Sequence, residues 1–124
     1  MTDPNFIILY VADPLASAAF YERLLGRAPV DASPNFAMFA LRCGVMLGLW
    51  ARQEVQPAVP AGAGCAAELA FTVDNVAAVE QRFAQWREAG LTLIQPPTAM
   101  DFGFTFTAVD PDGHRLRVFT PTAA

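Results

Sequence analysis

Residues 6–26, FIILYVADPLASAAFYERLLG, decide the fold, because they join one strand to one helix through a capping signal. The aromatic and β-branched run Phe6–Val11 predicts a strand. Asp13 then predicts a helix N-cap, and Pro14 fits the first helical position that follows a cap. Apolar residues recur at helical spacing as far as Leu25, and Gly26 predicts the end of the helix.

The same order of signals returns in the second half of the chain, in the stretch ELAFTVDNVAAVEQRFAQWREAG. Glu68–Val73 predicts a strand, Asp74 and Asn75 supply a cap, and 76–89 predicts a helix that ends at Gly90. The predicted apolar face of this helix consists of Val76, Val79, Phe83 and Trp86.

Three short strands are predicted after each helix, with tight turns at Cys43-Gly44 and at 110–113. Their ranges are 28–31, 36–42 and 45–51 in the first half, and 92–95, 104–109 and 116–119 in the second. We therefore predict an α+β fold in which two βαβββ modules, about 5–52 and 65–121, are joined by a linker over 53–64. Neither module can bury enough apolar surface alone, so residues 1–124 are expected to form one domain whose two curled mixed sheets surround a cleft.

The charged side chains exclude several classes of protein. The net charge is −4 and all eight cationic side chains are arginine, which argues against a nucleic-acid surface and excludes a lysine Schiff base. Only His114, Cys43 and Cys65 offer nitrogen or sulfur ligands, too few and too scattered for a typical zinc site.

Location and redox state follow from the same inventory. The two cysteines lie in apolar surroundings and in no CxxC pattern, so buried, reduced thiols are expected. The chain starts without a basic segment and a cleavable apolar segment, and its longest apolar run, Phe6–Ala12, is too short to span a bilayer. A cytoplasmic protein that binds no membrane is expected.

Three motifs, in this order and at these spacings, resemble the vicinal oxygen chelate superfamily. They are Val11-Ala12-Asp13 with the helix to Gly26, Val73-Asp74-Asn75-Val76, and Asp110-Pro111-Asp112-Gly113-His114. That superfamily includes glyoxalase I, ring-cleaving dioxygenases, and bleomycin- and phenazine-resistance proteins. The resemblance covers nearly the whole chain and implies the glyoxalase/bleomycin-resistance fold and a homodimer.

Enzymes of this superfamily hold a divalent metal with four side chains, mostly His and Glu. The resemblance places these four positions at Phe6, near Gly48, at Glu68 and at Arg117. Only one of the four is a carboxylate and one is a cation, which repels a metal. We therefore expect no metal and no other cofactor, and a binding protein rather than an enzyme.

The residues left around the lost metal site predict a binding site of another kind. Strand alternation places Phe6, Ile8 and Tyr10 on one face, with Trp50 pointing the same way as Gly48. Phe104 and Phe106 share one face of their strand, but the pattern does not say which face. With Glu68 and Arg117 at its floor, such a cleft has the composition of a small-molecule site.

Each of these residues also has a purely structural interpretation. Trp50 either stacks on a ligand or covers the core or a dimer interface, and Tyr10 either contacts ligand or only packs. Glu68 and Arg117 either form a structural ion pair or contact a ligand as well. His114 is expected to be an exposed turn residue, although its near-neutral pKa in water would suit a general base.

The sequence predicts a protein that sequesters a planar aromatic compound, such as an antibiotic, in an apolar cleft at a dimer interface. Within the superfamily this resembles the phenazine-resistance branch, on the segments Leu9-Tyr10-Val11, Leu49-Trp50 and Phe102-Gly103-Phe104-Thr105-Phe106. The alternative is a metal-dependent lyase, isomerase or dioxygenase with unusual ligands, such as Glu68 with His114, Glu54 or Asp101. A domain that acts only through protein partners is a third hypothesis.

Overall fold

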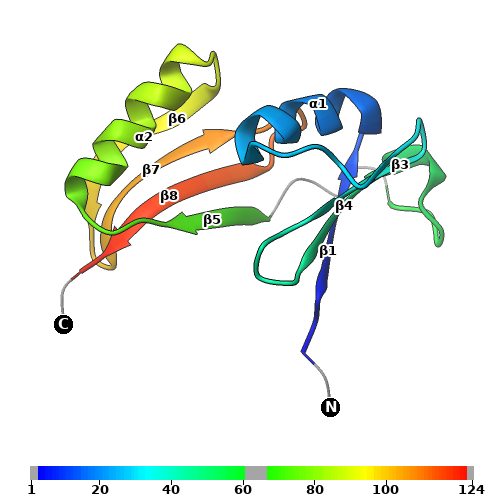
Figure 1. The fold of residues 1–124 in the computed structure, drawn as a ribbon, viewed down its shortest axis with the longest axis horizontal. Helices are drawn as coiled ribbons and strands as arrows, with labels where there is room; N and C mark the ends of the chain where they lie inside the picture. The colour runs from blue at the N-terminus through cyan, green and yellow to red at the C-terminus, as the bar shows by residue number, and fades with distance from the viewer. Residues whose placement is uncertain (1–2, 61–66, 123–124) are drawn as a thin grey trace. The chain divides into compact units, whose positions relative to one another are not determined.

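The chain folds into two compact units, Met1–Ala63 and Gly64–Ala124, in the computed structural model, which describes residues 3–60 and 67–122. Each unit runs strand, helix and three strands (Figure 1). The predicted α+β class and the tandem βαβββ order are confirmed. The predicted linker begins in a short 3₁₀ helix, Arg52–Glu54, and Val55 beside it is buried; residues 61–64 lie outside the described part of the chain.

Unit 1 contains one helix and a mixed four-stranded sheet. Its elements are β1 (Phe6–Val11), α1 (Pro14–Leu25), β2 (Asp31–Ala32), β3 (Phe36–Ala40) and β4 (Met46–Ala51). The strand order is β1-β4-β3-β2, with β1 parallel to β4 and the other pairs antiparallel. The first and last long strands of the unit are therefore direct neighbours.

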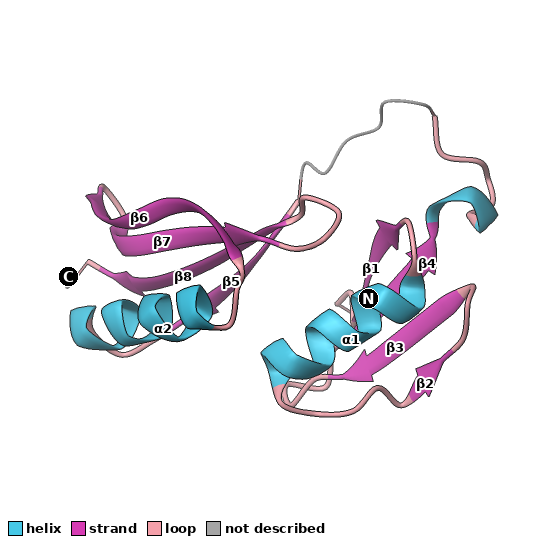
Figure 2. Cartoon of the chain, turned by 90° about the horizontal axis from the view of Figure 1, so that it is seen from above, coloured by secondary structure: helices cyan, strands magenta, loops and turns pink. Residues whose placement is uncertain are grey.

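Unit 2 repeats this arrangement. Its elements are β5 (Glu68–Thr72), α2 (Val76–Glu88), β6 (Thr92–Met100), β7 (Gly103–Val109) and β8 (Arg115–Pro121). The strand order is β5-β8-β7-β6, with β5 parallel to β8. In each unit the helix covers one face of its own sheet (Figure 2), so that the other sheet face carries no helix of that unit. We call this second face the open face.

The helix ends form as the sequence predicts. The Asp13 carboxylate accepts hydrogen bonds from the backbone N–H groups of Leu15 and Ala16, and Gly26 ends α1 in the left-handed conformation at φ 69°. In α2 the cap is Asn75, whose side-chain oxygen accepts from the N–H of Ala78. These bonds satisfy N–H groups that the first turn of a helix leaves without a backbone partner.

Each unit has its own core between helix and sheet. In unit 1 the core on the α1 side of the sheet includes Leu9, Val11, Leu47 and Leu49, whereas Ile7 at the start of β1 is 41 % exposed. In unit 2 the core is an aromatic cluster in which Phe106 meets Phe83 and Trp86 edge-on at 5.3 Å, and Trp86 also meets Phe71. Val76, predicted on the same apolar helix face, is instead 47 % exposed at the first turn.

Two strand predictions differ from the structure because of proline. The strand predicted over 28–31 is only Asp31–Ala32, since Pro29 has no N–H to donate to a sheet. The strand predicted over 92–95 continues through Pro96 and Pro97 to Met100. It can do so because β6 is an edge strand with register shifts at this point, where a missing donor breaks no ladder bond.

Two further findings concern the predicted burial of the cysteines and the prediction that no segment spans a membrane. Cys43 is exposed, so the prediction of a buried thiol is wrong for this residue; the turn at Gly44, with φ 90°, carries it outward. Cys65 lies outside the described residues. In the described ranges, neither helix has the length and apolar character that crossing a membrane requires.

Candidate functional site

The open face of unit 1 is aromatic. Tyr10 and Trp50 are register partners on the parallel pair β1 and β4, and their rings meet edge-on with centroids 6.4 Å apart. Phe6 and Phe36 lie further along the same face, with ring centroids at 6.5 Å. Phe6 and Tyr10 are each about 40 % exposed although both are large apolar groups. We call these four rings the aromatic face.

Gly48 lies at the centre of the aromatic face. A Cβ atom at this position would come within 2.8 Å of the rings of both Phe6 and Phe36. Ile8 is the register partner of Gly48 on β1 and is 43 % exposed. The missing side chain of Gly48 thus lets two rings lie over β4, and the predicted residues of unit 1 come together on one surface.

The open face of unit 2 is polar and is organised around Arg117. Its Nε donates a 2.8 Å hydrogen bond to Oε2 of Glu68, across the neighbouring strands β8 and β5. The predicted ion pair is therefore confirmed. The Arg117 side chain is 15 % exposed and that of Glu68 is 37 % exposed, so the pair is half-buried rather than sealed in a core.

Two further side chains hold the Arg117 guanidinium in place. Its Nη1 donates to Oε1 of Gln95 at 3.3 Å and to the hydroxyl of Thr105 at 3.2 Å. Both acceptors are themselves oriented, since Thr107 donates to the same Gln95 oxygen and Thr105 donates to the carbonyl of Val118. We call Arg117, Glu68, Gln95, Thr105 and Thr107 the Arg117 cluster.

Three residues that contact Arg117 are not singled out by the sequence pattern. Gln95 belongs to no motif, and it lies near Arg117 because it pairs with Thr107 across β6 and β7. Thr105 belongs only to the segment 102–106 that carries the resemblance, and it reaches Arg117 because β7 pairs with β8. Phe102 likewise belongs only to the segment that carries the resemblance, and its ring centroid lies 5.6 Å from the Arg117 guanidinium carbon. Alternation along β7 places Thr105 on one face of the sheet and Phe104 and Phe106 on the other. The sequence pattern does not say which of these two faces the helix covers.

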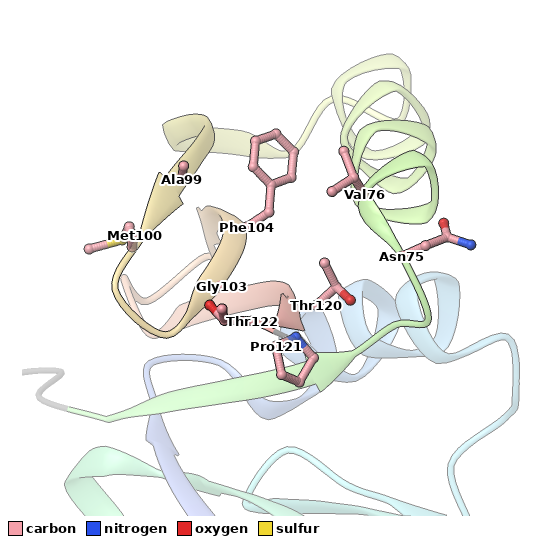
Figure 3. Close-up of a pocket in the computed structure, with 9 residues that line it drawn as sticks. All are labelled: Asn75, Val76, Ala99, Met100, Gly103, Phe104, Thr120, Pro121 and Thr122. Atoms are coloured by element: carbon pink, nitrogen blue, oxygen red, sulfur yellow. The ribbon is translucent and has the colours of Figure 1, made fainter. Parts of the chain in front are cut away.

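Phe104 and Phe106 belong to the covered face of unit 2, so they do not join the Arg117 cluster. Phe106 is fully buried under α2, and its predicted role in ligand binding is wrong because no surface of it is accessible. Phe104 is half-buried and lines a pocket of about 490 Å³ between the start of α2 and one end of the sheet (Figure 3). That pocket is lined by Asn75, Val76, Ala99, Met100, Gly103, Phe104, Thr120, Pro121 and Thr122.

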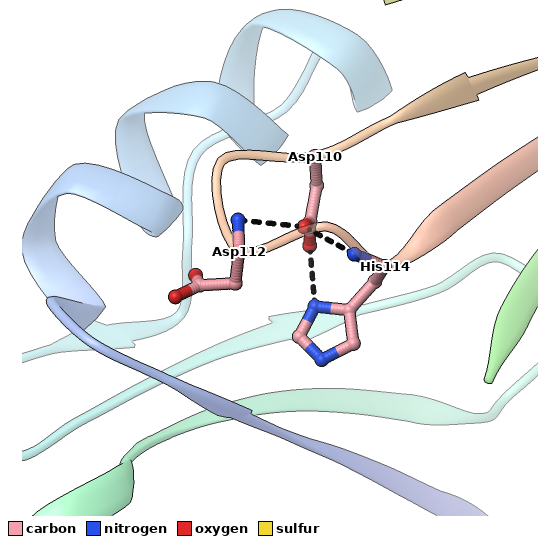
Figure 4. A group of neighbouring side chains, drawn as sticks. All are labelled: Asp110, Asp112 and His114. Atoms are coloured by element: carbon pink, nitrogen blue, oxygen red, sulfur yellow. Dashed lines mark hydrogen bonds and ion pairs between the residues drawn. The ribbon is translucent and has the colours of Figure 1, made fainter. Parts of the chain in front are cut away.

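His114 is buried, which corrects the prediction of an exposed turn residue. Its Nδ1 lies 2.8 Å from Oδ2 of Asp110, whose side chain is fully buried. The other Asp110 oxygen accepts from the backbone N–H groups of Asp112 and His114 (Figure 4). Because an ionised carboxylate only accepts, this bond assigns a proton to Nδ1. The motif at 110–114 therefore closes a turn on its own polar groups.

Neither candidate set of ligands fits a divalent metal. Asp110, Asp112 and His114 lie close enough to share an ion, but Asp110 is used by the bonds that build the turn. At the four positions that the resemblance aligns with metal ligands, Phe6 and Gly48 have no donor atom. Glu68 there is neutralised by the adjacent Arg117 guanidinium, which repels a cation.

Comparison with known proteins agrees with this architecture. The profile of the Glyoxalase/Bleomycin resistance protein/Dioxygenase superfamily matches residues 4–118. A phenazine antibiotic resistance protein of Enterobacter agglomerans is 27 % identical over 119 residues, which cover 93 % of this chain and 89 % of that protein.

Two solved structures have the same fold. An Agrobacterium tumefaciens protein solved by solution NMR is 50 % identical, with a TM-score of 0.87, covering 99 % of this chain and 100 % of that one. A glyoxalase-related enzyme from Fulvimarina pelagi is 26 % identical, with a TM-score of 0.81, covering 100 % of this chain and 94 % of that one.

Proposed function

Since the chain belongs to the Glyoxalase/Bleomycin resistance protein/Dioxygenase superfamily, we propose that it binds and sequesters a planar aromatic compound, such as an antibiotic, without a metal. The observation that carries this proposal is the aromatic face of unit 1. Four rings gather there around Gly48, on the sheet face that α1 does not cover. Large exposed apolar groups that cluster in this way mark binding surfaces.

The chemistry of these rings favours a flat, π-rich ligand. Trp50 and Tyr10 meet edge-on at 77°, so a planar heteroaromatic ring can stack on one of them and meet the edge of the other. Each such aromatic contact adds about 0.5–1.5 kcal/mol beyond the area that it buries. The likeness to a phenazine resistance protein supports the same ligand class, because phenazine is a planar heteroaromatic.

The proposal includes a homodimer in the cytoplasm. Strand β1 lies at the edge of its sheet, and Phe6, Ile7, Ile8 and Tyr10 on it are each 38–43 % exposed. Apolar edge strands are covered in native assemblies, because an exposed one pairs with other chains. A second copy of the chain would supply that cover and bring further residues to the site.

Tryptophan fluorescence tests the proposal, because the chain has one tryptophan on the aromatic face and one in the core of unit 2. We expect phenazine to quench the fluorescence of the Trp86→Phe variant, in which Trp50 is the single reporter. In the Trp50→Phe variant we expect little quenching of the buried Trp86, which is 6 % exposed. Trp50→Ala should weaken binding about tenfold, in line with the loss of one stacking contact.

Unfolding controls separate loss of the site from loss of the fold. Trp50 is half-buried on the open face, so the Trp50→Phe variant should keep the wild-type melting temperature within a few degrees. A panel of phenazine, acridine and quinoline compounds that produces neither quenching nor a thermal shift in the wild-type protein would contradict the proposal.

Elemental analysis separates this proposal from a metal-dependent lyase, isomerase or dioxygenase. We expect the purified protein to contain less than about 0.1 equivalent of zinc, nickel, manganese or iron per chain, because Glu68 is paired with Arg117. Chelator treatment should leave both the melting temperature and phenazine quenching unchanged. One tightly bound ion per chain would favour the enzyme instead.

A further inference from the structure

Thr120, near the end of β8, is a buried residue with an unused hydroxyl group. Of the other buried threonines of unit 2, Thr105 donates to the carbonyl of Val118 and Thr107 donates to Gln95. Thr120 is 8 % exposed, and its hydroxyl makes no hydrogen bond to any residue in 3–60 or 67–122. In those ranges every side-chain oxygen or nitrogen that is sealed from solvent has a partner, so the Thr120 hydroxyl is reached from the pocket that it lines.

This pocket lies on the face of the sheet that α2 covers, at the end where the helix begins. Alternation along β8 turns Leu116, Val118 and Thr120 to that face, and Thr120 is the register partner of Phe104 on β7. Leu116 and Val118 are fully buried, whereas Thr120 and Phe104 border open space beside the first turn of α2 (Figure 3). Every residue that lines the pocket belongs to unit 2, so this unit forms the pocket alone.

Most of the pocket wall is apolar. Phe104 contributes a half-buried ring, and Val76 and Met100 are 47 % and 43 % exposed. No charged side chain is among the lining residues, so a charged ligand would lose water without gaining a counter-charge. The volume of about 490 Å³ falls within the range of about 300–1,000 Å³ that is usual for small-molecule sites. The pocket therefore suits a small, uncharged and mainly apolar ligand.

The polar groups beside this wall favour a ligand that carries an oxygen atom. The side-chain oxygen of Asn75 accepts from the N–H of Ala78, which leaves the N–H groups of Val76 and Ala77 without a partner in the described ranges. The N-terminal end of a helix carries a partial positive charge, which attracts an electron-rich oxygen. The Thr120 hydroxyl can both donate and accept, so a ligand hydroxyl matches it in either direction.

We propose that this pocket binds a small uncharged molecule with an apolar body and one hydroxyl group, such as a phenol or an alcohol of similar size. The ligand hydroxyl forms a hydrogen bond with Thr120, and the apolar body packs against Phe104, Val76 and Met100. The site lies under the start of α2 and shares no residue with the aromatic face of unit 1. The inference is therefore independent of the proposed function.

Phenol and toluene test the inference, because toluene carries a methyl group where phenol carries the hydroxyl. Both dissociation constants are measured on the whole chain from the NMR chemical shift of the Met100 methyl group. Thr120→Val keeps the shape of the side chain and removes its hydroxyl. In this variant we expect phenol to bind about fivefold more weakly and toluene to bind within about twofold of the wild-type value. The ratio of the two constants within each variant cancels a partial loss of folded protein.

Two further variants serve as controls. Thr122 also lines the pocket, but its hydroxyl donates to the carbonyl of Asp101, so Thr122→Val should leave both constants unchanged. Ala99 is exposed, lines the pocket and is the register partner of Phe104. A ring at this position would fill the space, so Ala99→Phe should abolish the shift at Met100 with either probe.

The possible outcomes separate the ligand class from the location of the site. If Thr120→Val weakens phenol and toluene equally, or weakens neither, the assignment of a hydroxyl ligand to Thr120 is overturned. Binding that survives in Ala99→Phe, or a wild-type Met100 signal that responds to neither probe, overturns the site itself. Quenching of Trp50 by phenazine reports on the other unit, so the proposed function stands or fails by its own test.

Discussion

The Phe106→Ala variant is expected to lose about 3–5 kcal/mol of unfolding free energy, the cost of removing a phenylalanine from a packed core. Phe106 is fully buried and is the residue on which Phe83 and Trp86 of α2 both pack, each at 5.3 Å. Its removal leaves a cavity between helix and sheet that these large rings cannot fill without moving. Urea unfolding followed by circular dichroism measures the loss.

Phe104→Ala is the matched control, because this residue lies on the same face of the same strand. Phe104 is half-buried and already borders a pocket, so truncating it should cost less than half as much as truncating Phe106. Equal costs for the two variants would contradict the assignment of Phe106 to the core and would reopen a role in ligand binding.

Asp110→Ala is expected to cost about 3 kcal/mol, because one buried carboxylate satisfies three donors. These are the backbone N–H groups of Asp112 and His114 and the His114 ring, all at 2.8–2.9 Å. Each buried donor left without a partner costs about 1–3 kcal/mol, partly recovered where water can enter. Thermal unfolding at pH 7 measures the change.

Asp110→Asn gives an intermediate result if the carboxylate serves the turn. The amide oxygen can still accept from both backbone N–H groups, so this variant should recover part of the stability that alanine loses. Adding a chelator or zinc should change the melting temperature of the wild-type protein, Asp110→Ala and Asp110→Asn by the same amount. A stabilisation by zinc that Asp110→Ala alone abolishes would show instead that 110–114 holds a metal.

The sequence was sufficient for the elements with strong local signals. Helix α1 begins after the cap Asp13 and ends at Gly26, and helix α2 begins after the cap Asn75, as the sequence predicts. The strand at Phe6–Val11 also has the predicted ends. The errors lie where the effect of a residue depends on its strand neighbours. Pro96 and Pro97 would interrupt a central strand, but β6 becomes an edge strand only when the sheet order is known.

Part of the candidate site, like part of the fold, was predictable from the sequence. Strand alternation and the resemblance were enough to bring Tyr10, Trp50 and Gly48 together, and to pair Glu68 with Arg117. The direction of Phe106 was not predictable, because its strand contains aromatic residues of one parity and threonines of the other, and small buried threonines can lie on either face. The burial of His114 depends on a side-chain contact four residues back, which no periodicity encodes.

The sheet order has a consequence for how the chain folds as it is synthesised. In each unit the first strand pairs with the last, β1 with β4 and β5 with β8, so neither sheet can be completed until its final strand has left the ribosome. The apolar segment Phe6–Val11 is therefore unpaired until its partner Met46–Ala51, some 40 residues later in the chain, has been synthesised. Pairing strands that are this far apart in sequence requires closing a long loop, which slows folding. The sheet of unit 1 can form before the strands of unit 2 are synthesised. The order of synthesis therefore favours pairing of each first strand with the last strand of its own repeat, rather than with a strand of the other repeat.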